Sequence, residues 1–159
     1  MNNKRVVNKY STVEKLINKI MWDGKKSLAK EIINETFNYL KKKLNQDPLF
    51  VLKELVEALK LELETKKWKF GGASRLISKK VSLERSQSLA LNWLVRAARK
   101  KKMGKISENL AQEIATAWED QKNLKETKAE FKPKSEVFKK WQTEQKKVIE
   151  SINFTSSFK

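Results

Sequence analysis

Residues 66–80, KKWKFGGASRLISKK, combine six basic side chains with two aromatic rings and contain no acidic residue. The adjacent glycines Gly71 and Gly72 supply the positive φ angles that a two-residue type I′ turn requires, so the segment predicts a β-hairpin. Basic side chains interleaved with aromatic rings hold phosphates and stack on bases. The hairpin is therefore predicted to lie on a nucleic acid, and a surface hairpin without a ligand is the alternative.

A two-residue turn also fixes which residues of the hairpin face each other. The predicted pairs are Phe70 with Ala73, Trp68 with Arg75, Lys66 with Ile77, and Glu64 with Lys79. This register predicts a cation–π contact between Trp68 and Arg75 and an ion pair between Glu64 and Lys79. Because an isolated two-stranded hairpin is only marginally stable in water, we expect a nucleic acid to complete its packing.

The helix predicted to follow the N-cap Ser82 carries a second candidate site. At 100° per residue, an arc of about 80° collects Arg85, Ser88, Asn92, Arg96, Arg99 and Met103. The remaining positions from 89 to 98 are apolar, so this helix is predicted to lie at the centre of a bundle. The stripe holds three of the five arginines, whose planar guanidinium suits phosphates and bases. An ordinary solvated edge of a core helix is the alternative.

Three basic clusters flank these two features: NNKRVVNKY at the start, DGKKS in a helix–helix turn, and RKKKMGK after the central helix. Each alone is typical of a solvated charge run, but together they extend one basic surface. The predicted RNA-binding residues are Lys4, Arg5, Lys25, Lys26, Lys66, Lys67, Trp68, Lys69, Arg75, Lys79, Lys80, Arg85, Arg96, Arg99, Lys100, Lys101 and Lys102. If they neutralise about 6–10 phosphates, affinity falls steeply with salt.

The formal net charge of +17 is unevenly placed along the 159 residues. Residues 1–107 hold 26 basic and 10 acidic side chains, whereas residues 108–150 hold 9 of each. A surface that is basic only for solubility would spread its excess, so the asymmetry indicates a binding face on the first two-thirds. With no His, no Cys and no Gly-rich phosphate loop, the sequence predicts no enzyme, no cofactor and no metal site.

The elements that must position these residues are almost all helical. The periodicity predicts a mainly α fold, a single six-helix domain with one protruding two-stranded β-hairpin between the third and fourth helices. Ser11 and Glu14 have capping-box spacing, so the first helix is predicted to begin at Ser11. The predicted organisation is a basic N-terminal arm over 1–10, a helical domain over 11–150 with the hairpin at about 61–82, and a loose tail over 151–159.

Several motifs of this chain resemble one known family. MWDGKKSLAKEII, KKWKFGG, SQSLALNWLVRAARKK and LAQEIATAWED occur in the order found in the seventh protein of the ribosomal small subunit. The resemblance implies an rRNA-binding helical domain that binds the 3′ major, or head, domain of small-subunit rRNA and nucleates head assembly. It implies as partners the neighbouring head proteins, and tRNA and mRNA in the exit region beside the hairpin. Carried over by position, the rRNA contacts coincide with the basic surface defined above.

The composition bears on where such a protein works. Lysine outnumbers arginine 31 to 5, which indicates A/T-rich coding and favours a mitochondrial member, with plastid and bacterial cytoplasm as alternatives. No membrane contact and no autonomous homo-oligomer are expected. A nonspecific basic protein that compacts DNA is the alternative function, and a basic membrane-surface protein is a weaker one.

Overall fold

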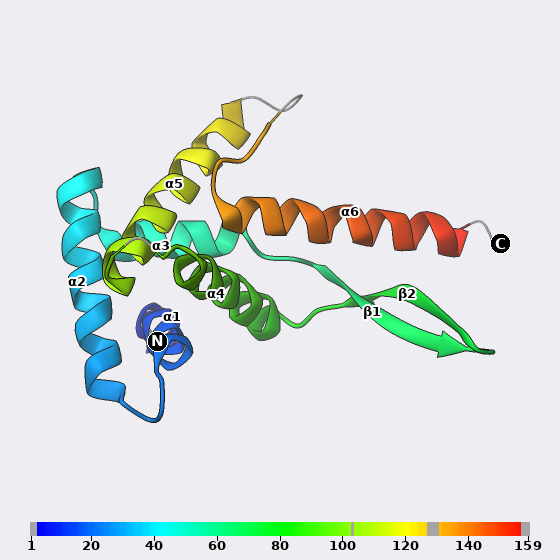
Figure 1. Ribbon diagram of the computed structural model, residues 1–159, viewed down its shortest axis with the longest axis horizontal. Coiled ribbons are helices and arrows are strands. Elements are labelled where there is room, and N and C mark those ends of the chain that lie inside the picture. Colours follow the sequence, from blue (N-terminus) through cyan, green and yellow to red (C-terminus); the bar gives the residue numbers. More distant parts are fainter. Residues whose placement is uncertain (1–2, 103, 127–130, 157–159) are drawn as a thin grey trace.

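The computed structural model describes residues 3–102, 104–126 and 131–156, which form a helical bundle with a projecting hairpin (Figure 1). The elements are α1 (Asn3–Ile20), α2 (Lys26–Leu44), α3 (Pro48–Ala58), β1 (Leu63–Phe70), β2 (Ala73–Lys80), α4 (Leu83–Lys100), α5 (Ile106–Glu126) and α6 (Glu136–Ser156). The mainly α fold, with its hairpin between the third and fourth helices, is confirmed.

Capping side chains begin three of these helices, including the predicted N-cap Ser82. The side-chain oxygens of Asp47, Ser82 and Ser135 accept backbone N–H groups of α3, α4 and α6 at 3.1, 3.4 and 3.3 Å. Pro48 occupies the first turn of α3, where its missing N–H costs no helical hydrogen bond. These local signals therefore fix where the helices start.

The two ends of the chain are more helical than the sequence predicts. Helix α1 begins at Asn3, so Ser11 lies inside the helix and the capping-box prediction is wrong. No Gly or Pro interrupts residues 1–22, and nothing in that stretch stops the helix from extending toward the N-terminus. At the other end, α6 continues to Ser156, so residues 151–156 are not a loose tail.

The core is built around α4, whose apolar positions face its neighbours on most sides. Its buried residues are Ser86, Ala90, Leu91, Trp93, Leu94, Val95, Ala97 and Ala98. Helices α1, α3, α5 and α6 all pack against it. The predicted polar stripe lies at the surface of α4, with Arg85, Arg96 and Arg99 exposed and Ser88 and Asn92 half-buried. Leu83, Glu84 and Lys100, at the two ends of the helix, are exposed as well.

The hairpin has the register that its turn predicts. Phe70 pairs with Ala73, and Trp68 lies opposite Arg75. Gly71 and Gly72 have φ angles of 55° and 83°, both in the left-handed region that a type I′ turn requires.

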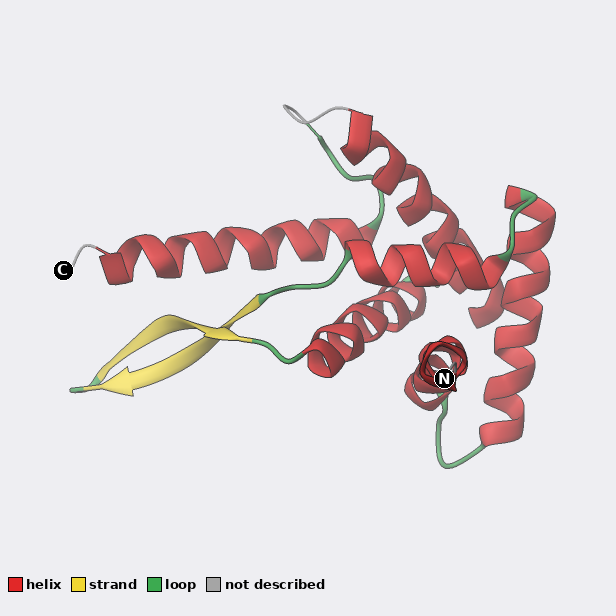
Figure 2. Ribbon diagram, turned by 180° about the vertical axis from the view of Figure 1, so that it is seen from behind, coloured by secondary structure: helices red, strands yellow, loops and turns green. Residues whose placement is uncertain are grey.

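Helix α6 packs along this hairpin, a contact that the sequence does not predict. The helix touches both strands, and the two project side by side from the bundle (Figures 1 and 2). The paired residues Thr65 and Ser78 are half-buried, whereas Trp68 and Arg75, on the opposite face of the pleat, are exposed. Helix α6 thus covers the hairpin only near Thr65 and Ser78, whereas Lys67, Lys69 and Leu76 farther along the same face are exposed.

Two buried carboxylates of α5 fix the direction in which α6 leaves the bundle. Asp120 accepts the backbone N–H groups of Ser135 at 2.7 Å and Lys134 at 3.2 Å. Glu113 accepts the N–H of Val137 at 3.1 Å. These groups lie at the positive end of the α6 dipole, where negative charge is favourable. The support for the hairpin is therefore anchored in the core.

Candidate nucleic-acid interface

The open face of the hairpin carries basic, aromatic and aliphatic side chains together. Lys66, Trp68, Ile77 and Lys79 share this face, because Lys66 pairs with Ile77 and each lies an even number of residues from the others on its strand. The indole of Trp68 is 55% exposed. An exposed indole between lysine side chains can stack on a base while the ammonium groups hold phosphates.

The root of the hairpin is held by an ion pair other than the predicted one. The carboxylate of Glu64 accepts two hydrogen bonds from Arg85, from Nε and Nη2, both at 2.7 Å. The predicted pair between Glu64 and Lys79 is therefore corrected, because the start of α4 brings the forked guanidinium of Arg85 to this carboxylate. Arg85 fastens the hairpin to α4, and its side chain is 58% exposed, so its contact with rRNA stays a prediction.

This ion pair makes the hairpin root sensitive to acid. The hydrogen bonds from Arg85 hold the pKa of Glu64 below its ordinary value. A lowered pKa means that the contribution of the pair is present above the ordinary pKa of a glutamate and is lost as the pH falls through the folded value. We expect the Arg85 Nε–H resonance in NMR spectra to be protected at neutral pH and to lose protection in that acidic range. In Glu64→Gln it should be weakly protected at every pH, and protection that persists to full protonation in the wild type would contradict the assignment.

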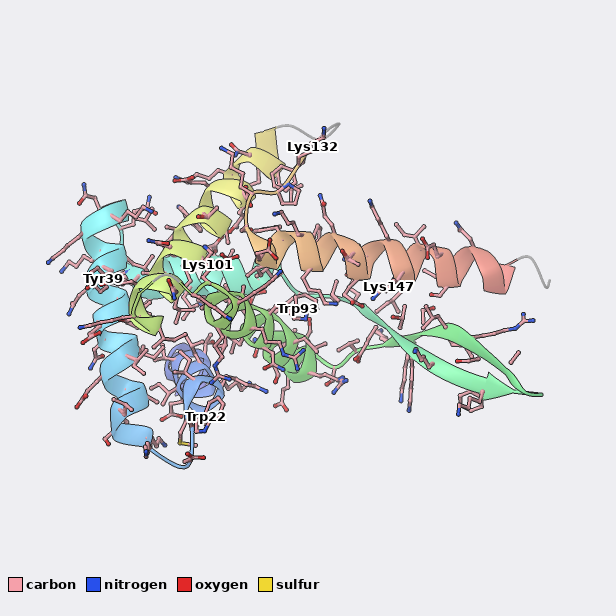
Figure 3. All side chains as sticks on the ribbon, in the orientation of Figure 1. Trp22, Tyr39, Trp93, Lys101, Lys132 and Lys147 are labelled. Atoms are coloured by element: carbon pink, nitrogen blue, oxygen red, sulfur yellow. The ribbon has the colours of Figure 1, made fainter. Side chains whose placement is uncertain are left out.

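The exposed stripe of α4 ends in two arginines with different surroundings. Arg96 is exposed and makes no hydrogen bond or ion pair within the described residues. Arg99 donates from Nη2 to the carbonyl oxygen of Ile20 at 3.1 Å, and its guanidinium carbon lies 5.2 Å from the ring centroid of Trp22. Figure 3 shows Trp22 by the turn between α1 and α2. The stripe therefore reaches the basic DGKKS turn.

The lysines that follow the stripe divide into two kinds. Lys101 pairs with the fully buried carboxylate of Glu113 at 2.6 Å. It neutralises a core charge, so its ammonium is less available to a phosphate than those of the neighbouring lysines. Lys100 pairs with Glu136 at 2.9 Å on the surface, where water screens the contact and a phosphate can replace it. Lys102 is exposed.

Most of the predicted contacts are available to a ligand. Of the predicted contacts, the exposed cations without an ion-pair partner among the described residues are Lys25, Lys26, Lys66, Lys67, Lys69, Lys79, Lys80, Arg96 and Lys102. Arg75 is exposed on the hairpin as well. The backbone of Lys4 and Arg5 belongs to α1, and their side chains lie outside the described residues.

Several lysines of residues 108–150, the part of the chain without net charge, form ion pairs within α6. On α6, Lys140 and Lys147 both hydrogen-bond the carboxylate of Glu144, at 2.8 and 3.0 Å, and Lys139 pairs with Glu136 at 3.1 Å. Lys132 and Lys146 of the same part of the chain are exposed and have no ion-pair partner among the described residues. Many cations of the hairpin and the DGKKS turn stay open, whereas Lys139, Lys140 and Lys147 pair within their own helix.

The residues predicted from the sequence do not include one member of this surface, the tryptophan in MWDGKKS. Trp22 is 67% exposed, and the guanidinium of Arg99 covers part of its ring. An aromatic residue next to a basic turn is a signal that could have marked it, but the indole fitted the end of the apolar stripe of α1 equally well.

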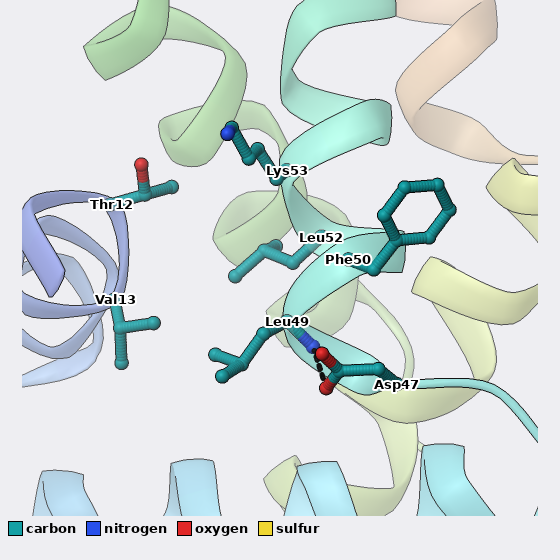
Figure 4. A pocket seen from close by; sticks show the side chains of 7 residues that line it. All are labelled: Thr12, Val13, Asp47, Leu49, Phe50, Leu52 and Lys53. Atoms are coloured by element: carbon teal, nitrogen blue, oxygen red, sulfur yellow. Dashed lines mark hydrogen bonds between the residues drawn. The ribbon is translucent and has the colours of Figure 1, made fainter. Parts of the chain in front are cut away.

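The hollows of the described surface offer no catalytic arrangement. The hollow in Figure 4, about 260 Å³, lies between α1 and α3 and is lined mainly by apolar side chains. Its one carboxylate, Asp47, already accepts the N–H of Leu49. Among the described residues no cluster of metal-ligand side chains occurs, and none of the described helices has the length and apolarity to cross a membrane.

Comparison with known proteins points to one family. The family model described as Ribosomal protein S7p/S5e matches residues 1–140, which ends near the start of α6. Small ribosomal subunit protein uS7 of Thermotoga neapolitana is 44% identical over 106 residues, covering 67% of this chain and 68% of the relative. The uS7 proteins of Dictyoglomus thermophilum and Thermoanaerobacter sp. (strain X514) are 44% and 42% identical over 105 residues, each covering 66% of this chain and 67% of the relative.

Proposed function

This chain belongs to the ribosomal protein S7p/S5e family, and from that membership we propose that it binds small-subunit rRNA through a continuous basic surface. The chain is a structural constituent of the small ribosomal subunit and has no catalytic role of its own. We define the basic surface as the open face of the hairpin, the end of the α4 stripe at Arg96 and Arg99, and the DGKKS turn.

The observation that carries this proposal is the set of exposed, unpaired cations on these three elements. An exposed lysine or arginine without a carboxylate partner keeps its counterions until a phosphate replaces them, and their release drives binding. The stripe of α4 starts at the root of the hairpin and ends beside the DGKKS turn. A single rRNA segment can therefore contact all three parts.

Recognition of folded RNA is the proposed mode, as opposed to general affinity for nucleic acid. Phosphate contacts position the protein, while the arginines and the exposed indole of Trp68 contact bases or ribose in unpaired or bent RNA. We expect a folded small-subunit rRNA fragment to stay bound in the presence of excess duplex DNA, with affinity falling steeply as salt rises. Filter binding with the DNA competitor measures this. Displacement by DNA as easily as by the same rRNA would instead favour the nonspecific DNA-compacting protein.

The finer partners are those that the family resemblance implies. We propose that the contacted rRNA is the 3′ major domain, that the chain nucleates assembly of the head, and that the hairpin reaches toward tRNA and mRNA in the exit region. The hairpin supports this because its tip stands clear of the bundle, and α6 stiffens it from one side. Neighbouring head proteins would meet the surfaces outside the basic surface.

The place of action is the ribosome. The relatives come from Thermotoga, Dictyoglomus and Thermoanaerobacter, which favours the bacterial cytoplasm among the three predicted locations. A mitochondrial location stays a prediction from amino-acid composition alone. Sedimentation of the native protein with small-subunit particles, from whole cells and from purified organelles, separates the two.

A further inference from the structure

Trp22 is exposed in a way that core packing does not explain. Trp93 and Trp118 are buried in the bundle, whereas Trp22 has 67% of its surface exposed. It lies at the junction of α1 with the DGKKS turn, inside the basic surface. A large apolar ring held in water is unfavourable unless another group covers it.

The ring is held in place from one side. The guanidinium of Arg99 lies 5.2 Å from the indole centroid and is itself fixed by its hydrogen bond to the carbonyl of Ile20. The backbone of Trp22 is fixed as well, because its carbonyl oxygen accepts the N–H of Lys25 at 3.0 Å. The turn closes through Asp23 and Gly24, with φ angles of 49° and 72°. The indole is thus preorganised, which lowers the entropy cost of binding.

The surroundings of the ring indicate what covers it. Lys25 and Lys26 are exposed on the turn, and Arg99 adds a third positive charge, against the single carboxylate of Asp23. An apolar protein partner would have to desolvate these cations, whereas a nucleotide offers a flat base for the indole and a phosphate for the ammonium groups.

We propose that Trp22, backed by Arg99, is a stacking platform for one unpaired base of rRNA. The base lies on the indole, and the flanking phosphates meet Lys25 and Lys26. This inference rests on the proposed rRNA binding and adds to it a position where a base, and not only the backbone, is held.

The test compares two substitutions that both keep apolar bulk over Arg99. Trp22→Phe retains an aromatic face, and Trp22→Leu does not. With the full chain and a folded small-subunit rRNA fragment, we expect Trp22→Leu to lower affinity roughly tenfold and Trp22→Phe only about twofold, since base stacking needs a π face. Wild-type tryptophan fluorescence should be quenched on binding, with less quenching in Trp22→Phe. The matched control is Phe50→Leu, an exposed aromatic of α3 outside the basic surface, which should bind as wild type.

The possible results separate this inference from the function on which it rests. Equal affinity of wild type and Trp22→Leu overturns the platform, and rRNA binding stands if Arg96→Ala with Arg99→Ala still weakens it. In another outcome, Trp22→Leu binds naked rRNA normally but is poorly incorporated into particles that contain other ribosomal proteins. That result would also overturn the platform, and it would assign Trp22 to a contact with a neighbouring protein. If the wild type itself does not prefer rRNA over duplex DNA, the proposed function fails first.

Discussion

Replacing Arg96 and Arg99 together with alanine weakens binding to small-subunit rRNA by roughly a hundredfold or somewhat more. Each guanidinium lost removes a charge-assisted contact worth about 1.5 kcal/mol, and tenfold in affinity corresponds to roughly 1.4 kcal/mol. Arg96 is exposed and has no partner within the described residues, so its removal leaves the fold intact. Arg99 also backs Trp22, and its loss therefore acts on two parts of the basic surface.

The matched control removes the same charge elsewhere. Lys132 and Lys146 are exposed and lie in the neutral part of the sequence, so Lys132→Ala with Lys146→Ala should lower affinity only a few-fold. Filter binding of both double variants to the same rRNA fragment at one salt concentration measures the difference. Arg96→Lys with Arg99→Lys should fall between them, because charge remains and the fork is lost. Equal losses of rRNA affinity for the arginine and lysine double variants would contradict the proposed basic surface.

Glu113→Ala is expected to destabilise the fold by about 3 kcal/mol, the largest effect on stability that we predict. The carboxylate of Glu113 is fully buried, pairs with Lys101 at 2.6 Å and accepts the N–H of Val137. Its removal leaves a half-buried ammonium and a buried N–H without partners. The side chain of Lys101 is 28% exposed and can turn to water, which keeps the loss at the low end of the range for buried pairs.

Urea unfolding followed by circular dichroism measures this stability. Glu113→Gln keeps an acceptor for Val137 but not the charge, so it should lose less than the alanine variant. Glu119→Ala, an exposed position on the same helix, should change stability by less than about 0.5 kcal/mol. Amide exchange should become faster at the start of α6 in Glu113→Ala. An alanine variant as stable as the wild type would show that α6 does not depend on this carboxylate.

The hairpin and the α4 stripe could be predicted because both depend on local spacing. Gly71 and Gly72 select the turn, the turn fixes the register, and the register places Trp68 opposite Arg75. The period of the α-helix likewise separates Arg96 and Arg99 from the buried residues of α4. Such features need only neighbours in sequence.

The partners of individual charges could not be predicted, because they depend on how distant elements meet. Glu64 bonds to Arg85 and not to its strand neighbour Lys79, since the start of α4 folds back over the hairpin root. Lys101 stands in a basic run, and only the packing of α5 shows that its charge is used inside the protein. The same holds for Asp120, a buried acid whose acceptors face the first turn of α6.

The packing of α6 along the hairpin has a consequence for biogenesis. Translation proceeds from the N-terminus, so the hairpin emerges well before the helix that packs along it. During that interval both faces of the basic hairpin are exposed to solvent and to RNA. Because an isolated two-stranded hairpin is only marginally stable in water, we expect the hairpin to become fully ordered only after α6 has been made.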